Sequence, residues 1–82
     1  MGGKVIDPEL AYKAIDHPDG PLTDREVTVL RLTAAGSPPR EVASQLHLSY
    51  GTVRNYLAST VAKLGARNRV DAIRIATDSG WI

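Results

Sequence analysis

"LSYGTVRNYLASTVAKLGARNR", Leu48 to Arg69, is the stretch in which helical periodicity is clearest. Ser49 suits an N-cap, and apolar side chains then recur every three or four positions, so we expect a helix over about residues 50–64. Its inward side comprises Val53, Leu57, Val61 and Leu64, with Tyr56 at the margin. The stretch contains four cationic side chains and no carboxylate, although the formal net charge of the chain is only +1. A locally basic surface of this kind attracts a polyanion, of which nucleic acid is the commonest.

The opposite side of this helix is small and polar. It comprises Gly51, Arg54, Asn55, Ala58 and Ala62. The DNA major groove admits one α-helix, in which Arg can donate two hydrogen bonds to guanine and Asn can pair with adenine. Hydroxyls near the helix start, here those of Ser49 and Thr52, can meet phosphates. An adjacent Arg and Asn also occur on ordinary solvated helices, so this pair alone leaves both interpretations open.

Two shorter helices are predicted before it. Thr23, followed three residues later by Glu26, matches a capping box, and Gly36 can end that helix in a left-handed conformation. Its apolar stripe is Val27, Leu30 and Ala34. Ser37 is then a good N-cap and Pro38 suits the first turn of the next helix. The stripe of this short helix is Val42, Ala43 and Leu46.

A fourth helix is predicted from Arg69 to Ser79, with Asn68 as its N-cap and Asp71 at the capping-box position. One side carries Ala72, Ile75, Ala76 and Ser79, and the other carries Val70, Ile73 and Thr77, with Arg74 beside them. A terminal helix cannot bury two sides in so small a domain. We expect one side to face the core and the other to face a partner, such as the same helix of a second subunit. The alternative is that Val70 and Ile73 edge the core.

The helix signals together predict an all-α fold. No stretch shows the sustained alternation that a strand requires. We therefore expect a small four-helix domain of the helix-turn-helix type over residues 21–82. Residues 1–20 are expected to form a linker with a short helix from Pro8 to about Ile15, capped by Asp7 and followed by a Pro/Gly segment.

Composition narrows the classes of function. The 82 residues include no Cys, and His17 and His47 stand far apart without further ligands, so we expect neither a metal nor a cofactor. Apolar runs are too short for a membrane span or a signal peptide, which predicts a soluble, cytoplasmic protein that does not use a membrane. Residues 1–20 carry two cations and four acids, whereas residues 42–70 carry four cations and no acid. Charge is therefore segregated along the chain.

Several motifs occur in one order: "LTDRE" at residues 22–26, "AAG" at 34–36, "EVA" at 41–43, "LSYGTVRNY" at 48–56 and "KLGARNR" at 63–69. This succession resembles the LuxR-type helix-turn-helix domain at the C-terminus of NarL/FixJ-class bacterial response regulators, over residues 22–82. The motifs are most similar to those of regulators of the DesR kind, although Ala58 and Ser59 differ from that pattern.

The resemblance implies transcription regulation by a homodimer bound to double-stranded DNA. It implies base contacts at Arg54 and Asn55, and on the same face at Gly51 and Ala58, where some relatives carry a lysine that is missing here. It implies phosphate contacts at Arg40, Thr52, Tyr56 and Lys63, supported along the same track by Ser37, Ser49, Arg67 and Arg69. It implies a dimer surface made of Val70, Ile73, Arg74 and Thr77.

The resemblance also implies a context for the domain. Receiver domains precede this domain in two-component regulators, phosphorylation there favours dimers, and RNA polymerase is a further partner. The chain lacks a phosphoacceptor Asp in a βα framework, so we interpret it as a C-terminal output module. A free-standing or ligand-sensing LuxR-type regulator is the alternative.

Two other classes of function lead to different expectations. A helical interaction domain whose basic face meets an acidic protein would bind without preferring any DNA sequence. Catalysis is not expected, because no His lies in a nucleophile motif, the acids are scattered and no Gly-rich phosphate loop is present. Finally, Glu26 and Arg69 each lie at a helix start, and an ion pair between them would tie the first helix to the fourth. Alternatively, Glu26 serves the capping box only.

Overall fold

Residues 20–82 are described by the computed structural model of the chain, and they form four α-helices and no strand. The helices are α2 (Asp24–Ala34), α3 (Pro39–Leu46), α4 (Tyr50–Leu64) and α5 (Arg69–Asp78). The predicted all-α, four-helix fold class is confirmed. The predicted helix at residues 8–15 lies outside the described residues, and the division of the chain near residue 20 stays a prediction.

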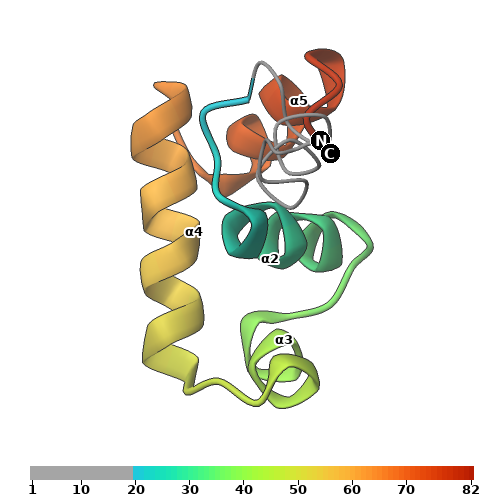
Figure 1. Ribbon diagram of the computed structural model, residues 1–82, viewed down its shortest axis with the longest axis vertical. Helices are drawn as coiled ribbons and strands as arrows, with labels where there is room; N and C mark the ends of the chain where they lie inside the picture. The colour runs from blue at the N-terminus through green and yellow to red at the C-terminus, as the bar shows by residue number, and fades with distance from the viewer. Residues whose placement is uncertain (1–19) are drawn as a thin grey trace, which may run out of the picture.

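The longest helix, α4, organises the arrangement, because each of the other three packs against it. Figure 1 shows α4 upright, with its N-terminal end at the bottom. The short helix α3 lies beside this end, α2 lies beside the middle, and α5 lies beside the C-terminal end (Figure 1). The N-terminal end of α4 is therefore remote from α5.

Helix α2 begins with the predicted capping box. The Thr23 hydroxyl accepts the N–H of Glu26 at 3.2 Å, and the Glu26 carboxylate accepts the N–H of Thr23 at 2.8 Å. Gly36 follows the helix with a φ of 105°, as its predicted left-handed role requires. The predicted stripe was wrong at Ala34, which is exposed, and it omitted Val29, which is fully buried. The buried face is wider than one stripe because α3, α4 and α5 all contact α2.

The predicted start of α3 at Ser37 is wrong by one residue. Pro38 is the N-cap, with an extended backbone at ψ 159°, and Pro39 is the first helical residue. A residue that precedes proline is disfavoured in the helical region, so Pro39 keeps Pro38 out of the helix and displaces Ser37 from the cap. At the other end, His47 is a left-handed C-cap with a φ of 57°, a conformation that glycine usually supplies.

The bounds of the last two helices follow the predictions closely. Helix α4 has the predicted extent, with Ser49 as its N-cap and Gly65 as a left-handed C-cap. Helix α5 follows the predicted N-cap Asn68 and ends at Asp78, one residue before the predicted Ser79. Local capping chemistry therefore specifies most of the helix ends.

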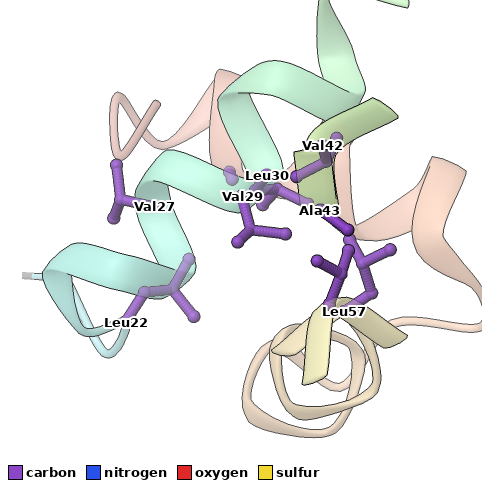
Figure 2. Close-up of a cluster of buried hydrophobic side chains, with 9 residues drawn as sticks. Leu22, Val27, Val29, Leu30, Val42, Ala43 and Leu57 are labelled. Carbon is purple, nitrogen blue, oxygen red and sulfur yellow. The ribbon is translucent and has the colours of Figure 1, made fainter. Parts of the chain in front are cut away.

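The core lies where α2, α3 and α4 meet, with α5 closing it. Its members are Leu22, Val27, Val29, Leu30, Val42, Ala43, Val53, Leu57 and Ala76. Figure 2 shows Leu57 pointing from α4 towards α2 and α3. The inward side of α4 was predicted only in part, because Val61 and Leu64 are half-buried. Thr60 is fully buried instead, with its hydroxyl donating to the carbonyl of Leu57 at 2.7 Å.

The C-terminus folds back onto the start of the described chain. The N–H of Trp81 donates to the carbonyl of Ala76 at 2.8 Å. Its indole lies against Gly20, where a Cβ would come within 3.3 Å of the ring. Trp81 thereby joins the beginning of the described chain to its end.

Candidate nucleic-acid interface

The N-terminal end of α4 is capped by two hydroxyls. The hydroxyl of Ser49 accepts the N–H of Thr52 at 3.1 Å and donates to the Thr52 hydroxyl oxygen at 2.8 Å. These bonds satisfy one helix-start N–H and leave the Thr52 hydroxyl proton without an acceptor among residues 20–82. Both predicted phosphate contacts therefore lie at the positive end of the helix dipole.

The outward face of α4 is open from its first turn to its third. Arg54, Asn55, Gly51 and Ala58 are all exposed, as predicted. A Cβ at Gly51 would meet nothing within 4 Å, and the backbone there is helical, not left-handed. Neither packing nor backbone conformation requires this glycine, although glycine inside a helix costs up to about 1 kcal/mol relative to alanine. The face therefore suits a partner that approaches the backbone closely.

Tyr50, the first residue of α4, is a member of this surface that sequence reasoning missed. Its ring is 40% exposed. The guanidinium carbon of Arg40, from the first turn of α3, lies 4.6 Å from the ring centroid, and that of Arg54 lies 5.8 Å from it. Both distances fall within the range of cation–π contacts. The sequence does contain a signal for the contact with Arg54, because residues four positions apart are neighbours on a helix face and Tyr50 precedes Arg54 by four.

At the other end of α4, a buried carboxylate anchors the helix. Glu26 is only 5% exposed, and its Oε1 accepts the N–H of Thr23 at 2.8 Å and the ammonium of Lys63 at 2.9 Å. Its Oε2 accepts the hydroxyl of Ser59. The predicted ion pair with Arg69 is wrong, since Lys63 is the cation and Arg69 is exposed at the start of α5. Capping and ion pairing do not compete, because one carboxylate offers about four acceptor positions.

These contacts change the titration of Glu26. Burial alone would raise its pKa, but hydrogen bonds from Ser59, Lys63 and the Thr23 backbone, with the charge of Lys63, lower the pKa from 4.5 to about 2. The carboxylate is therefore ionised at neutral pH. Its negative charge offsets that of the Lys63 ammonium, whose side chain is 38% exposed.

A second carboxylate, Asp71, gathers cations at the start of α5. It accepts the backbone N–H of Arg67 at 3.0 Å, one residue earlier than a capping box requires, and the Nη2 of Arg74 at 2.8 Å. The Arg67 guanidinium lies 3.6 Å away. These hydrogen bonds, that of the Arg67 backbone first, lower the pKa of Asp71, and Asp71 in turn raises the pKa of Arg74. Arg74 also lies 3.6 Å from Asp78.

Only some of the cations between Leu48 and Arg69 are paired with a carboxylate. Two of the four cations, Lys63 and Arg67, pair with carboxylates that α2 and α5 supply. Arg54 and Arg69 form no ion pair within residues 20–82. At the N-terminal end of α4, Arg54 is joined by Arg40, which is likewise without an ion pair in the described part of the chain.

The remaining predicted residues lie elsewhere. Tyr56 is half-buried against the core, and Ser37 is half-buried in the turn between α2 and α3. On α5, Val70 is 72% exposed and Thr77 is exposed, whereas Ile73 packs half-buried against the core. The alternative that this side of α5 edges the core therefore holds for Ile73 and not for Val70.

None of α2 to α5 combines the length and the apolar character needed to cross a bilayer. Residues 20–82 also contain no group of three or more His, Asp or Glu side chains placed to hold a metal ion.

Comparison with known proteins covers most of the chain. The family described as bacterial regulatory proteins, luxR family, matches residues 20–76. The response regulator RamR of Streptomyces coelicolor is 51% identical over 80 residues, and the transcriptional regulatory protein DesR of Bacillus subtilis is 40% identical over 80 residues. Each match covers 98% of this chain and 40% of the relative, so the chain spans less than half of either protein.

A solved structure shares the fold. The structure of the transcription factor GerE matches with a TM-score of 0.70 at 34% identity, over 72% of this chain and 88% of the GerE chain. The resemblance predicted from the motifs, to regulators of the DesR kind among others, is confirmed.

Proposed function

The chain belongs to the luxR family of bacterial regulatory proteins, and from this premise we propose that it binds double-stranded DNA sequence-specifically to regulate transcription. The observation that carries the proposal is the N-terminal end of α4. There Arg54 and Asn55 are exposed beside Gly51 and Ala58, and no carboxylate of residues 20–82 pairs with Arg54. We propose that this face enters the major groove, where Arg54 donates two hydrogen bonds to a guanine and Asn55 pairs with an adenine.

Phosphate contacts are proposed on both sides of this face. Thr52 keeps a hydroxyl proton for a phosphate oxygen, and Arg40 lies next to the same end of α4. The other proposed backbone contacts are Ser37, Ser49, Tyr56, Lys63, Arg67 and Arg69. Lys63 and Arg67 already face carboxylates, so we expect them to contribute little to counterion release. Each phosphate contact adds about 0.9 to the slope of log affinity against log salt, and we therefore expect a shallow slope and weak binding by the isolated chain.

Assembly and context are part of the proposal. The exposed side of α5 that carries Val70 and Thr77, with Arg74 and the half-buried Ile73, would form the homodimer surface on DNA. Because RamR is a response regulator of which this chain spans 40%, we propose a receiver domain on the N-terminal side and RNA polymerase as a further partner. A dimer would place two α4 helices about one turn of DNA apart, which predicts a two-fold repeated site.

The test is selection of binding sites from a randomised duplex pool by the 82-residue chain, followed by fluorescence anisotropy at two salt concentrations. We expect a repeated motif that binds more tightly than a scrambled duplex. Arg54→Ala should cost about 1 to 3 kcal/mol of affinity and relax preference at one base position. Arg31→Ala in the last turn of α2 removes the same charge and is the matched control. Equal affinity for both duplexes, or an Arg54→Ala variant that keeps wild-type selectivity, would contradict the proposal and favour a protein-binding basic surface.

A further inference from the structure

One aromatic ring connects the two arginines at the N-terminal end of α4. Tyr50 begins this helix, Arg54 lies one turn further along it, and Arg40 comes from the first turn of α3. The guanidinium carbons lie 4.6 Å (Arg40) and 5.8 Å (Arg54) from the ring centroid. Tyr50 and Val70 are the large apolar residues most exposed among residues 20–82, so burial in the core does not explain the tyrosine.

The way a guanidinium is held decides what it can still bind. Arg74 is held by Asp71, which takes the Nε–H at 3.1 Å and an Nη2 hydrogen at 2.8 Å. An aromatic face attracts the cation through its quadrupole and uses none of the five N–H donors. The contact with Tyr50 therefore restricts the Arg54 side chain and leaves its edge available for a bidentate acceptor.

Restriction before binding favours affinity for one geometry. A long side chain that is ordered in advance loses less conformational freedom when it docks. Because the same ring also contacts Arg40, it fixes the arginine of α3 relative to the arginine of α4. The ring thus fixes the position of Arg40, which is proposed to meet a phosphate, relative to that of Arg54, which is proposed to meet a base.

We propose that Tyr50 is a positioning residue for DNA readout, orienting Arg54 towards a base edge and Arg40 towards the neighbouring backbone. The proposal rests on the proposed function of this face. The Tyr50 proposal goes beyond the proposed function because it assigns part of the DNA sequence preference to a residue that need not touch a base. Loss of the ring should reduce discrimination at the base read by Arg54 by about two- to fivefold.

Two variants separate the effect of the aromatic ring from that of an apolar side chain. Tyr50→Phe keeps the ring, and Tyr50→Leu keeps an apolar side chain without the ring. The measurement is the ratio of dissociation constants for the selected duplex and a duplex changed at the base read by Arg54, with and without Arg54→Ala. We expect Tyr50→Phe to keep the ratio and Tyr50→Leu to lower it. Tyr50→Leu should have no further effect on the ratio once Arg54 is alanine. An unchanged ratio in Tyr50→Leu, or an equal loss in both backgrounds, would overturn the proposal.

A second measurement on the 82-residue chain needs no DNA. Ring currents of Tyr50 should shift the side-chain proton resonances of Arg54 upfield in wild type and in Tyr50→Phe, and not in Tyr50→Leu. Absence of this shift in wild type would overturn the positioning role. If wild type binds selectively while Tyr50→Leu keeps the ratio, only this inference fails. If wild type shows no sequence preference, the proposed function fails first and the readout role fails with it.

Discussion

The two ends of α4 use the same kinds of side chain in opposite ways. Towards its C-terminal end, Ser59 and Lys63 direct their polar groups at the buried carboxylate of Glu26. At its N-terminal end, Arg54 is held by the ring of Tyr50 and its donors meet no carboxylate of residues 20–82. At 1.5 Å per residue, Arg54 and Lys63 lie about 14 Å apart along the axis of one helix.

The difference shows that a count of charges does not identify a binding surface. Lys63 and Arg54 contribute equally to the basic, acid-free stretch in the sequence. In the structure, one helps to fix α4 against α2, and the other is available to a partner. We therefore expect substitutions at the C-terminal end to change stability and substitutions at the N-terminal end to change binding.

The largest effect on stability is expected at Glu26. Its lowered pKa means that the ionised form stabilises the fold above pH 4.5 and that this stabilisation is lost as pH falls from 4.5 towards 2. At about 1.4 kcal/mol per pKa unit, Glu26→Gln should lower the free energy of unfolding by about 3 kcal/mol at pH 7. Urea denaturation at pH 7 and near pH 2 checks this, since the two proteins should converge at the lower pH.

The matched control for that comparison is Glu41→Gln, which changes an exposed glutamate in the first turn of α3. It should cost less than about 1 kcal/mol at pH 7. Equal losses for Glu26→Gln and Glu41→Gln would show that the contacts of Glu26 with Ser59 and Lys63 add no stability beyond that of an exposed glutamate. The contrast between the two ends of α4 would then fail.

An intermediate effect is expected at Lys63. Lys63→Met keeps the aliphatic stem but removes one charged hydrogen bond to Glu26, and partial exposure reduces the cost to about 1 to 2 kcal/mol. The salt dependence of DNA binding should change by much less than one phosphate contact. Denaturation and anisotropy at several salt concentrations measure both. A salt slope lowered by about 0.9 would show that Lys63 contributes a full phosphate contact in spite of Glu26, and it would weaken the contrast between the ends.

The smallest effect on stability is expected at Arg54. Its side chain is exposed and forms no ion pair among the described residues, so Arg54→Ala removes only the cation–π contact with Tyr50 and should change the free energy of unfolding by less than about 1 kcal/mol. The same variant should lose DNA affinity as described above. A large loss of stability would mean that the N-terminal end of α4 is structural as well.

Much of the fold was predictable because its signals are local. Thr23, Ser49 and Asn68 each accept an N–H three residues later, so the starts of α2, α4 and α5 could be identified from single residues. The exposed face of α4 followed from helical periodicity. The prediction of where α3 starts was wrong because two signals conflict there. The restriction that Pro39 imposes on Pro38 outweighs the capping tendency of Ser37.

The pairing of side chains could not be predicted in the same way. Lys63 reaches Glu26 across 37 positions of sequence, and this depends on how α4 crosses α2. The sequence pattern suggested Arg69 instead, because both residues lie at helix starts. Tyr50 was missed because its two contacts come from different helices, and the contact with Arg40 exists only once α3 and α4 have packed.

The contact between Trp81 and Gly20 has a practical consequence. The chain contains a single tryptophan, so its tryptophan fluorescence, excited selectively from that of the three tyrosines, comes from one place, the seam between the first described residues and the C-terminus. That seam adjoins α5 and lies away from the N-terminal end of α4 (Figure 1). Emission from Trp81 is therefore an intrinsic optical reporter of how the chain enters the domain, and it is separate from the surface proposed to bind DNA.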